Sequence, residues 1–174
     1  MNAIADIGEI RSAQCYIAER SAFLNCLLAI AREEDCHIIC FNADMMAGKV
    51  HARAAVFHAV RSFHEGDFIS NTIEMEALLF ASGSRQCSIA AGFGVHEGDN
   101  NLFVCCIPSK KRIWDTLGSL LTFVDDEWDQ MDPEKLLRIL RHFEISREEI
   151  QTLSDTSRIA DLVLERVALL HVSR

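Results

Sequence analysis

Positively charged side chains are the residues of this sequence whose spacing best suits the binding of a ligand. They are concentrated in three places, at Lys49, Arg53 and Arg61, at Arg85, and at Lys110, Lys111 and Arg112. If several of them converge with Asn71, they could bind the phosphates of a single-stranded nucleic acid while Phe68 or Phe80 stacks on a base. Cations dispersed over the surface are an equally good interpretation, because a sequence alone does not place side chains in space.

No group of residues has the spacing that catalysis or metal binding would require. The glycine-rich residues 92–98 follow a predicted helix and precede a predicted strand, which is the reverse of the order in a dinucleotide-binding loop. His96 and Glu97 begin a zinc-hydrolase pattern, but position 100 is Asn where that pattern requires a second histidine. We therefore predict no catalytic residues, no metal site and no cofactor.

His51 and His58 lie seven residues apart in a predicted helix and share one side of it. No cysteine or carboxylate stands three or four residues from either of them, and two imidazoles alone do not make a zinc site. We predict that both histidines are exposed on the surface.

The helix around which these side chains are arranged is predicted within residues 70–86. Thr72 can cap its start, and Gly83 can end it in a left-handed conformation. Its residues are apolar on nearly every side, which is typical of a helix buried in the core. A second helix is predicted to follow it, ending at about Gly92 or Gly94.

The remaining pattern predicts a single α+β domain over residues 1–174. Strands are predicted at residues 10–18, 36–42 and 102–107, the first of them possibly at an edge of the sheet. Further helices are predicted at residues 21–35, 49–65, 110–124, 134–143, 145–153 and 157–172. We expect a small mixed or antiparallel sheet of about three to four strands, covered by about seven to eight helices.

Composition limits the classes of function. Of the 174 residues, 49% are hydrophobic and 25% charged, and the net charge of −9 argues against nucleic-acid binding over the whole surface. No apolar run reaches the ~18 residues of a membrane span, and no signal peptide is apparent, so we expect a cytoplasmic protein that binds no membrane. The seven cysteines are scattered, and we expect free thiols rather than disulfides.

The last predicted helix carries more apolar surface than one packing face needs. Ile159, Leu162, Val163 and Val167 share one face, and Leu164, Ala168 and His171 extend the apolar surface round the helix. The helix is either sandwiched between two layers of its own domain or docks a partner protein through its second apolar face.

Three segments occur together that carry a family resemblance. They are FNADMMAGKVHARAAVFHAVRSF, ISNTIEMEALLFASGSRQCSIAAGFGV and the closing DLVLERVALL. In this order they resemble the smallest core subunit of the KEOPS complex, the PRPK-binding protein (TPRKB) family, of the archaeal type. The resemblance spans roughly residues 36–98 and the last helix.

The resemblance implies a non-catalytic auxiliary subunit. KEOPS places a threonylcarbamoyl group on the adenosine next to the anticodon of tRNAs that read ANN codons, and another subunit catalyses that transfer. The subunit that this chain resembles binds the N-terminal lobe of an atypical kinase/ATPase subunit and meets other KEOPS subunits indirectly. In archaea it also helps recruit tRNA by holding the single-stranded 3′ CCA end.

The resemblance also implies candidate sites. Positions within the matching motifs are candidates for tRNA binding, and we add two basic residues outside them for their charge alone: Lys49, Ser70, Asn71 and Arg85, then Lys110 and Lys111. The candidates for docking the kinase subunit are Leu164, Val167, Ala168 and His171. The alternative prediction is a stand-alone protein-interaction or dimerisation module without RNA binding, which would use the same last helix.

Overall fold

The computed structural model describes residues 7–126, 128–153, 155 and 158–172. These residues form four strands and eight α-helices, which confirms the predicted α+β class. In chain order the elements are β1 (Ile10–Ile17), α1 (Arg20–Glu33), β2 (His37–Asn42), α2 (Lys49–Glu65), α3 (Ile73–Ser82), α4 (Cys87–Ala90), β3 (Gly98–Ile107), α5 (Lys111–Leu117), β4 (Thr122–Val124), α6 (Pro133–His142), α7 (Arg147–Gln151) and α8 (Ile159–Val172).

The four strands form one antiparallel sheet in the order β2-β3-β1-β4. Strand β3 is the longest and pairs with β1 on one side and β2 on the other, with Ile10 opposite Cys105 and Ile39 also opposite Cys105. The sequence prediction that residues 10–18 form an edge strand is wrong, because β1 lies between β3 and β4. The edges of the sheet are β2 and β4.

Residues 110–124 do not form the single helix that their apolar spacing predicted. Helix α5 ends at Leu117, a turn follows, and Thr122, Phe123 and Val124 form β4 instead. These three residues pair with Gln14, Ala13 and Ser12 of β1. Long-range pairing with β1 thus prevails over the local helical pattern, as β-branched and aromatic residues readily allow.

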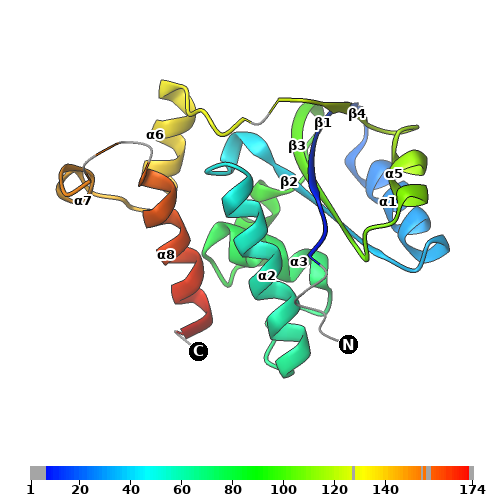
Figure 1. The fold of residues 1–174 in the computed structure, drawn as a ribbon, viewed down its shortest axis with the longest axis horizontal. Helices are drawn as coiled ribbons and strands as arrows, with labels where there is room; N and C mark the ends of the chain where they lie inside the picture. The colour runs from blue at the N-terminus through cyan, green and yellow to red at the C-terminus, as the bar shows by residue number, and fades with distance from the viewer. Residues whose placement is uncertain (1–6, 127, 154, 156–157, 173–174) are drawn as a thin grey trace.

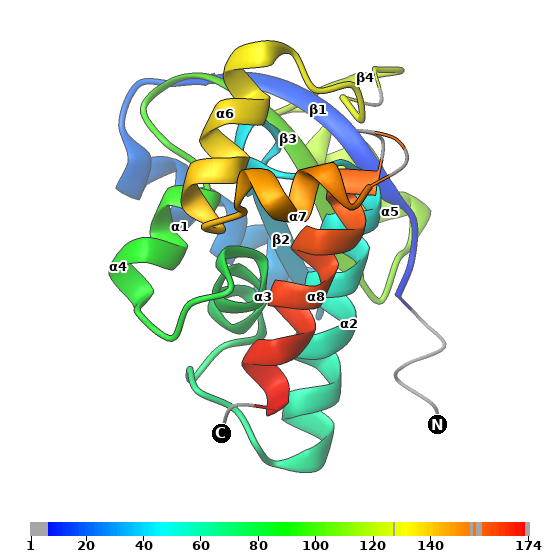
Figure 2. The same cartoon turned by 90° about the vertical axis from the view of Figure 1, so that its left-hand side faces the viewer.

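Helices cover both faces of the sheet, as Figure 1 shows. Helices α2 and α3 pack on the face that carries Phe41 and Phe103, and α8 closes this larger core from outside. Helices α1 and α5 pack on the opposite face, against Cys40 and Val104. Alternate residues of β2 and β3 therefore enter different cores, as the period of a strand requires. The quarter-turned view in Figure 2 shows α8 lying beside α2 and α3.

The predicted ends of the central helices are confirmed. The Thr72 hydroxyl accepts a hydrogen bond from Met75 N at the start of α3, and Gly83 follows its end with φ +61°. Gly66 follows α2 with φ +72°. Both glycines occupy the left-handed region, which other residues adopt at a cost.

The segments after β4 are helical and add to the larger core, with Ile139 of α6 completely buried in it. Asp132 and Pro133 begin α6, and Ser146 begins α7 through a capping box with Glu149. Among the described helices, none combines the length and the apolar composition needed to cross a bilayer. The seven cysteines are free thiols, as expected.

Candidate functional site

His51 is a buried connector between α2 and α3. The backbone N–H of Ala47 donates to its Nδ1 over 3.0 Å, so Nε2 carries the proton and donates to the Ala81 carbonyl over 2.9 Å. Burial lowers the pKa of His51 to about 4, which keeps the imidazole neutral. The prediction that His51 is exposed is wrong, because its side chain is fully buried between these helices.

His58, seven residues further along α2, is also not a free surface residue. Its ring is half-buried and stacks on Phe80 with 5.2 Å between ring centroids. Burial is the main reason that its pKa is lowered, and His171 on α8 lowers it further. The predicted exposure is therefore wrong for both histidines, because α3 and α8 cover the side of α2 that carries them.

The start of α2 is fixed by Asp129. One carboxylate oxygen of Asp129 accepts a hydrogen bond from the backbone N–H of Lys49 over 2.8 Å. Gly48 precedes it with φ +88°, and a Cβ there would collide with the same carboxylate. The Ala-Gly-Lys-x-His pattern is thus explained by folding, apart from the Lys49 side chain, which is half-exposed beside Arg11.

Ser70 belongs to a buried hydrogen-bond cluster. The Glu76 carboxylate accepts from the backbone N–H groups of Ile69 and Ser70 and from the Ser70 hydroxyl, at 2.8 to 3.1 Å. Glu76 is completely buried, and Ser70 is 8% exposed. The Ser70 hydroxyl therefore shapes the loop before α3, whereas its neighbour Asn71 is exposed to solvent.

The tRNA-binding candidates of α2 and α3 lie at two ends of the helix pair. The bond from His51 to Ala81 joins the start of α2 to the end of α3, so the helices run antiparallel. Lys49 and Arg85 are accordingly at one end, and Ser70 and Asn71 are at the other. The ten residues of α3 separate these ends by about 15 Å.

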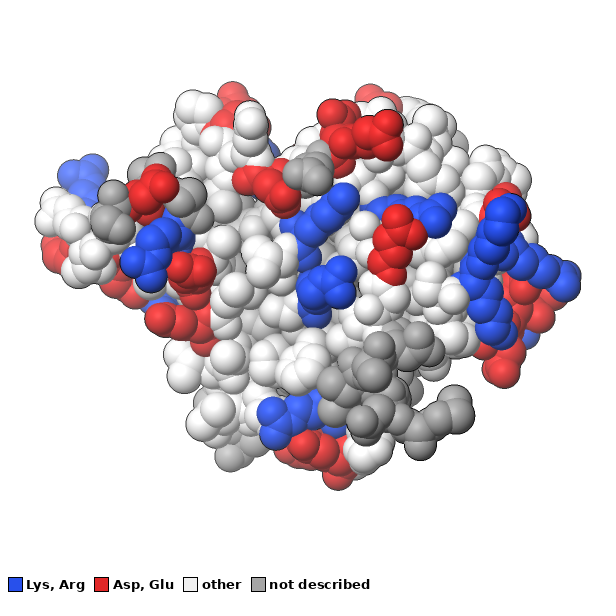
Figure 3. Space-filling model, viewed as in Figure 1, with Lys and Arg blue, Asp and Glu red and all other residues white. Residues whose placement is uncertain are grey.

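Lys110, Lys111 and Arg112 form a third, separate group at the start of α5. Lys111 pairs with Asp115 at 2.7 Å, and Arg112 pairs at 2.9 Å with Glu34, which follows α1 directly. On the face shown in Figure 3, the basic atoms over α5 and those over α2 are separate groups, with a further basic group and acidic and uncharged surface between them. The structure thus does not bring the six candidates together on one basic surface.

The outer sides of α2 and α8 form a shared apolar surface, which we call the α2–α8 face. It consists of Val50, Ala54 and Phe57 from α2 and Ala160, Leu164 and Ala168 from α8, all half-buried except Val50, which is 49% exposed. Val50 and Ala160 line the same hollow. Most of the surface between the two helices is neither acidic nor basic (Figure 3).

The four docking candidates of α8 have different environments. Val167 is completely buried in the core of this chain, with Ile159, Val163 and Leu170. Leu164 and Ala168 lie on the α2–α8 face. His171 is half-buried, and its Nε2 lies 3.8 Å from the Glu65 carboxylate of α2.

Comparison with known families decides the identity of the chain. Residues 18–171 match the family described as kinase binding protein CGI-121. This chain belongs to the CGI-121 family. No curated protein matches it.

Membership of the CGI-121 family covers nearly the whole fold, from the end of β1 to the last turn of α8. The family is one of kinase-binding proteins, so the surfaces to consider are those that could meet another protein. The apolar pattern of the sequence predicted the α8 half of the α2–α8 face but not the α2 half. A signal was present, because the apolar residues of α2 occupy two sides of the helix: Val56 and Val60 are buried, and Val50 and Phe57 are on the outer side.

Proposed function

We propose that this protein is a non-catalytic auxiliary subunit of the KEOPS complex, which modifies tRNA with threonylcarbamoyladenosine. In this role it binds the atypical kinase/ATPase subunit and helps recruit tRNA through the 3′ CCA end. The observation that carries the proposal is the match to a kinase-binding family over residues 18–171, together with the order of the three motif segments.

The α2–α8 face is the surface that we assign to the kinase subunit. Leu164 and Ala168 are half-buried on the α2–α8 face, where small and apolar side chains would let another helix or sheet approach closely. Interfaces of this kind have an apolar centre with few charges, and most of the surface between these two helices carries no charged side chain (Figure 3). Val167 does not belong to the proposed surface, because it packs inward.

We predict that Ala168→Glu weakens binding to the KEOPS kinase subunit by at least about thirtyfold, since it places a charge at the centre of an apolar contact. Leu169→Glu is the matched control, because Leu169 lies on the opposite flank of the same helix and is 54% exposed. Both affinities are measured by calorimetric titration with the purified kinase subunit. Equal affinities for wild type and Ala168→Glu would move the docking site elsewhere.

Two separate surfaces are available for tRNA. Arg85 and Asn71 are exposed at opposite ends of α3, so an RNA strand that contacts both must run along this helix. Glu74 lies between them, but its carboxylate pairs with His37 at 2.8 Å, which reduces its repulsion of phosphate. We therefore propose Lys49, Asn71 and Arg85 as the tRNA contacts. Ser70 acts through the loop that it shapes, and Lys110 and Lys111 are a second, independent surface.

We predict that Asn71→Ala with Arg85→Glu weakens tRNA binding about tenfold or more and reduces its salt dependence, because a phosphate contact is lost. The charge-matched control is Arg32→Glu, an exposed residue of α1. Filter binding is measured for tRNA with and without its CCA end at two salt concentrations. If neither the substitutions nor removal of CCA changes retention, the RNA assignment is wrong.

The alternative is a protein-interaction or dimerisation module without RNA binding, which the apolar α2–α8 face also favours. In that case sedimentation would show a dimer of the isolated protein, and Ala168→Glu would convert it into a monomer. A monomeric wild-type protein that binds the kinase subunit would contradict this alternative.

A further inference from the structure

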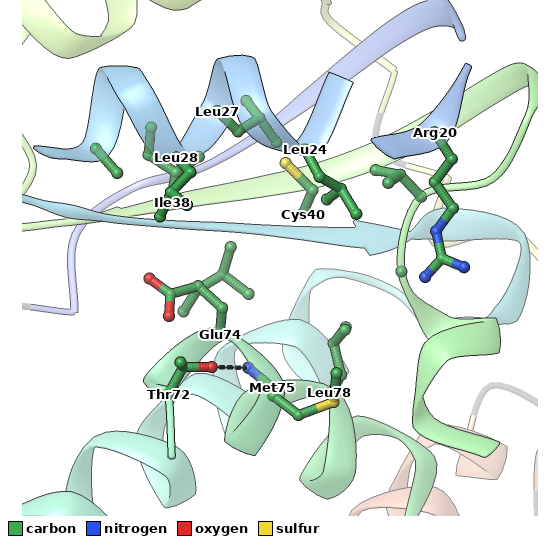
Figure 4. A pocket seen from close by; sticks show the side chains of 14 residues that line it. Arg20, Leu24, Leu27, Leu28, Ile38, Cys40, Thr72, Glu74, Met75 and Leu78 are labelled. Atoms are coloured by element: carbon green, nitrogen blue, oxygen red, sulfur yellow. Dashed lines mark hydrogen bonds between the residues drawn. The ribbon is translucent and has the colours of Figure 1, made fainter. Parts of the chain in front are cut away.

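A second apolar site, distinct from the α2–α8 face, lies at the β2 edge of the sheet. This cavity of about 290 Å³ runs along β2, the edge strand, and is lined by residues of α1, β2 and α3. We call it the β2 groove. Figure 4 shows Leu24, Leu27 and Leu28 of α1 on one side of β2, and Met75 and Leu78 of α3 on the other.

The groove lies astride the strand and not over one face of the sheet. Ile38 and Cys40 point into the core under α1, and Ile39 points into the core under α3, yet all three line the same cavity. Helices α1 and α3 therefore form two walls, and the outer edge of β2 forms the floor between them.

The outer edge of β2 offers backbone hydrogen-bonding groups. The strand pairs with β3 along all six of its residues, on one side only. No described residue forms a hydrogen bond with the backbone of Ile38, Ile39 or Cys40, the residues of β2 that line the groove, on the other side. A row of unpaired N–H and C=O groups is a template for one more strand.

The walls specify the side chains that an added strand would carry. Successive side chains of a strand point in opposite directions, so one set would meet Leu24 and Leu28 and the other would meet Met75 and Leu78. Leu24 and Leu28 are 41% and 48% exposed, which leaves apolar surface for a ligand to cover. A strand covered on both faces is a continuous apolar run, unlike a surface strand with alternating polarity.

The two ends of the groove differ in charge. Arg20 stands at the end where β2 finishes, and its guanidinium forms no ion pair with any described residue (Figure 4). At the other end Glu74 pairs with His37. An acidic group of the ligand would therefore lie beside Arg20.

A second copy of this chain does not suit the groove. In the second copy too, β2 lies in a recess between α1 and α3. The β2 edges of two copies could therefore pair only if α1 and α3 of one copy collided with those of the other. An extended segment that protrudes from another protein has no such obstacle.

From these observations we propose that the β2 groove binds an extended apolar segment of a partner protein, which adds a fifth strand beside β2 and places an acidic residue against Arg20. This site is separate from the α2–α8 face, but Glu74 belongs both to its lining and to the path along α3 that we propose for the RNA strand, so peptide and RNA would compete there. The pairing is antiparallel, as in the rest of the sheet, so the acidic residue precedes the apolar run.

The test uses a fluorescein-labelled probe peptide, acetyl-Asp-Val-Ile-Val-Leu-Lys, and measures its anisotropy with the full-length protein. We expect saturable binding that Leu28→Glu weakens by roughly tenfold or more, since it charges one wall. Leu137→Glu, at an exposed position of α6, is the matched control and should leave binding unchanged. Equal binding by wild type and Leu28→Glu would overturn the proposal.

Two further arms identify the binding mode. N-methylation of alternate peptide groups is tested in both frames, and the frame that removes the N–H groups facing β2 should abolish binding while the other frame retains it. Arg20→Glu should weaken the Asp probe and not a probe with Ala in place of Asp. Equal loss in both frames or in neither would exclude strand addition, and displacement by a CCA trinucleotide more readily than by unlabelled peptide would assign the groove to RNA instead.

Discussion

His51 uses both of its ring nitrogens, Nε2 to join α2 to α3 and Nδ1 to hold the segment just before α2. A neutral imidazole is a donor and an acceptor at once, which is what the Ala47 N–H and the Ala81 carbonyl require. A protonated ring would present a second donor to the Ala47 N–H and would carry a charge in an apolar core. The motif histidine is therefore a structural residue whose chemistry makes the fold sensitive to acid.

We predict that the free energy of unfolding falls as the pH is lowered from 6.5 to 4. In this window the unfolded chain takes up a proton on His51, whereas the folded chain does not, because burial lowers the pKa of His51 to about 4. The loss amounts to about 3 kcal/mol at pH 4. Urea unfolding of wild type and of His51→Gln measures it: the Gln variant keeps a donor and an acceptor but does not titrate, so its stability should fall less. Equal losses in the two proteins would contradict the prediction.

Helix ends are the elements that the sequence specifies most directly. Gly66 after α2 and Gly83 after α3 both have positive φ, and each donates its N–H back to a carbonyl of the last turn. Gly66 lies in the connection between α2 and α3, where the chain reverses and the two helices become antiparallel, whereas Gly83 ends α3 just before Arg85. An added Cβ at Gly66 would meet no atom within 4 Å, so any cost of substitution there comes from the backbone.

Substitution by alanine is predicted to lower the free energy of unfolding by about 1 kcal/mol at Gly66 and at Gly83. Gly92→Ala is the matched control for Gly66, because Gly92 lacks a positive φ and an added Cβ would meet no atom within 4 Å at either position, whereas at Gly83 it would contact Phe143 at 3.5 Å. Its stability should stay within about 0.5 kcal/mol of wild type. Denaturant midpoints of the three variants decide the matter, and an equal loss at all three positions would show that conformation is not the cause.

At the scale of the whole molecule, α8 determines which surfaces are core and which are available to partners. It is the last element of the chain, yet it covers α2 and α3 and completes the larger core through Ile159, Val163 and Val167. Its outer flank then continues the outer side of α2 as the α2–α8 face. One side of α8 thus packs in the core, and in our proposal its outer flank binds the kinase subunit.

Two adjacent substitutions in α8 are expected to separate these roles. Val167→Ala should lower the free energy of unfolding by about 1 to 3 kcal/mol and leave kinase binding by the folded protein intact, because it removes buried methyl groups. Ala168→Glu should leave stability within about 0.5 kcal/mol of wild type and abolish kinase binding. Thermal or urea unfolding and the calorimetric titration are measured on the same preparations. The reverse pattern would place Val167 at the interface and Ala168 in the core.

The sequence by itself determined the local features of this protein. Caps, glycines and apolar spacing predicted α2, α3, α6, α7, β2 and β3 with small errors at their ends, because these signals act between residues close together in the chain. The three motif segments indicated the family that the match to CGI-121 then supported.

Only the tertiary structure decided the features that depend on residues far apart. Pairing with β1 made a strand of residues 122–124, and contact with α3 buried His51, which the sequence analysis placed on the surface. The spread of the basic candidates over three places and the walls of the β2 groove likewise depend on how helices pack. The physical reason is that helical and strand periods specify which residues share a face, but long-range packing decides which face is covered.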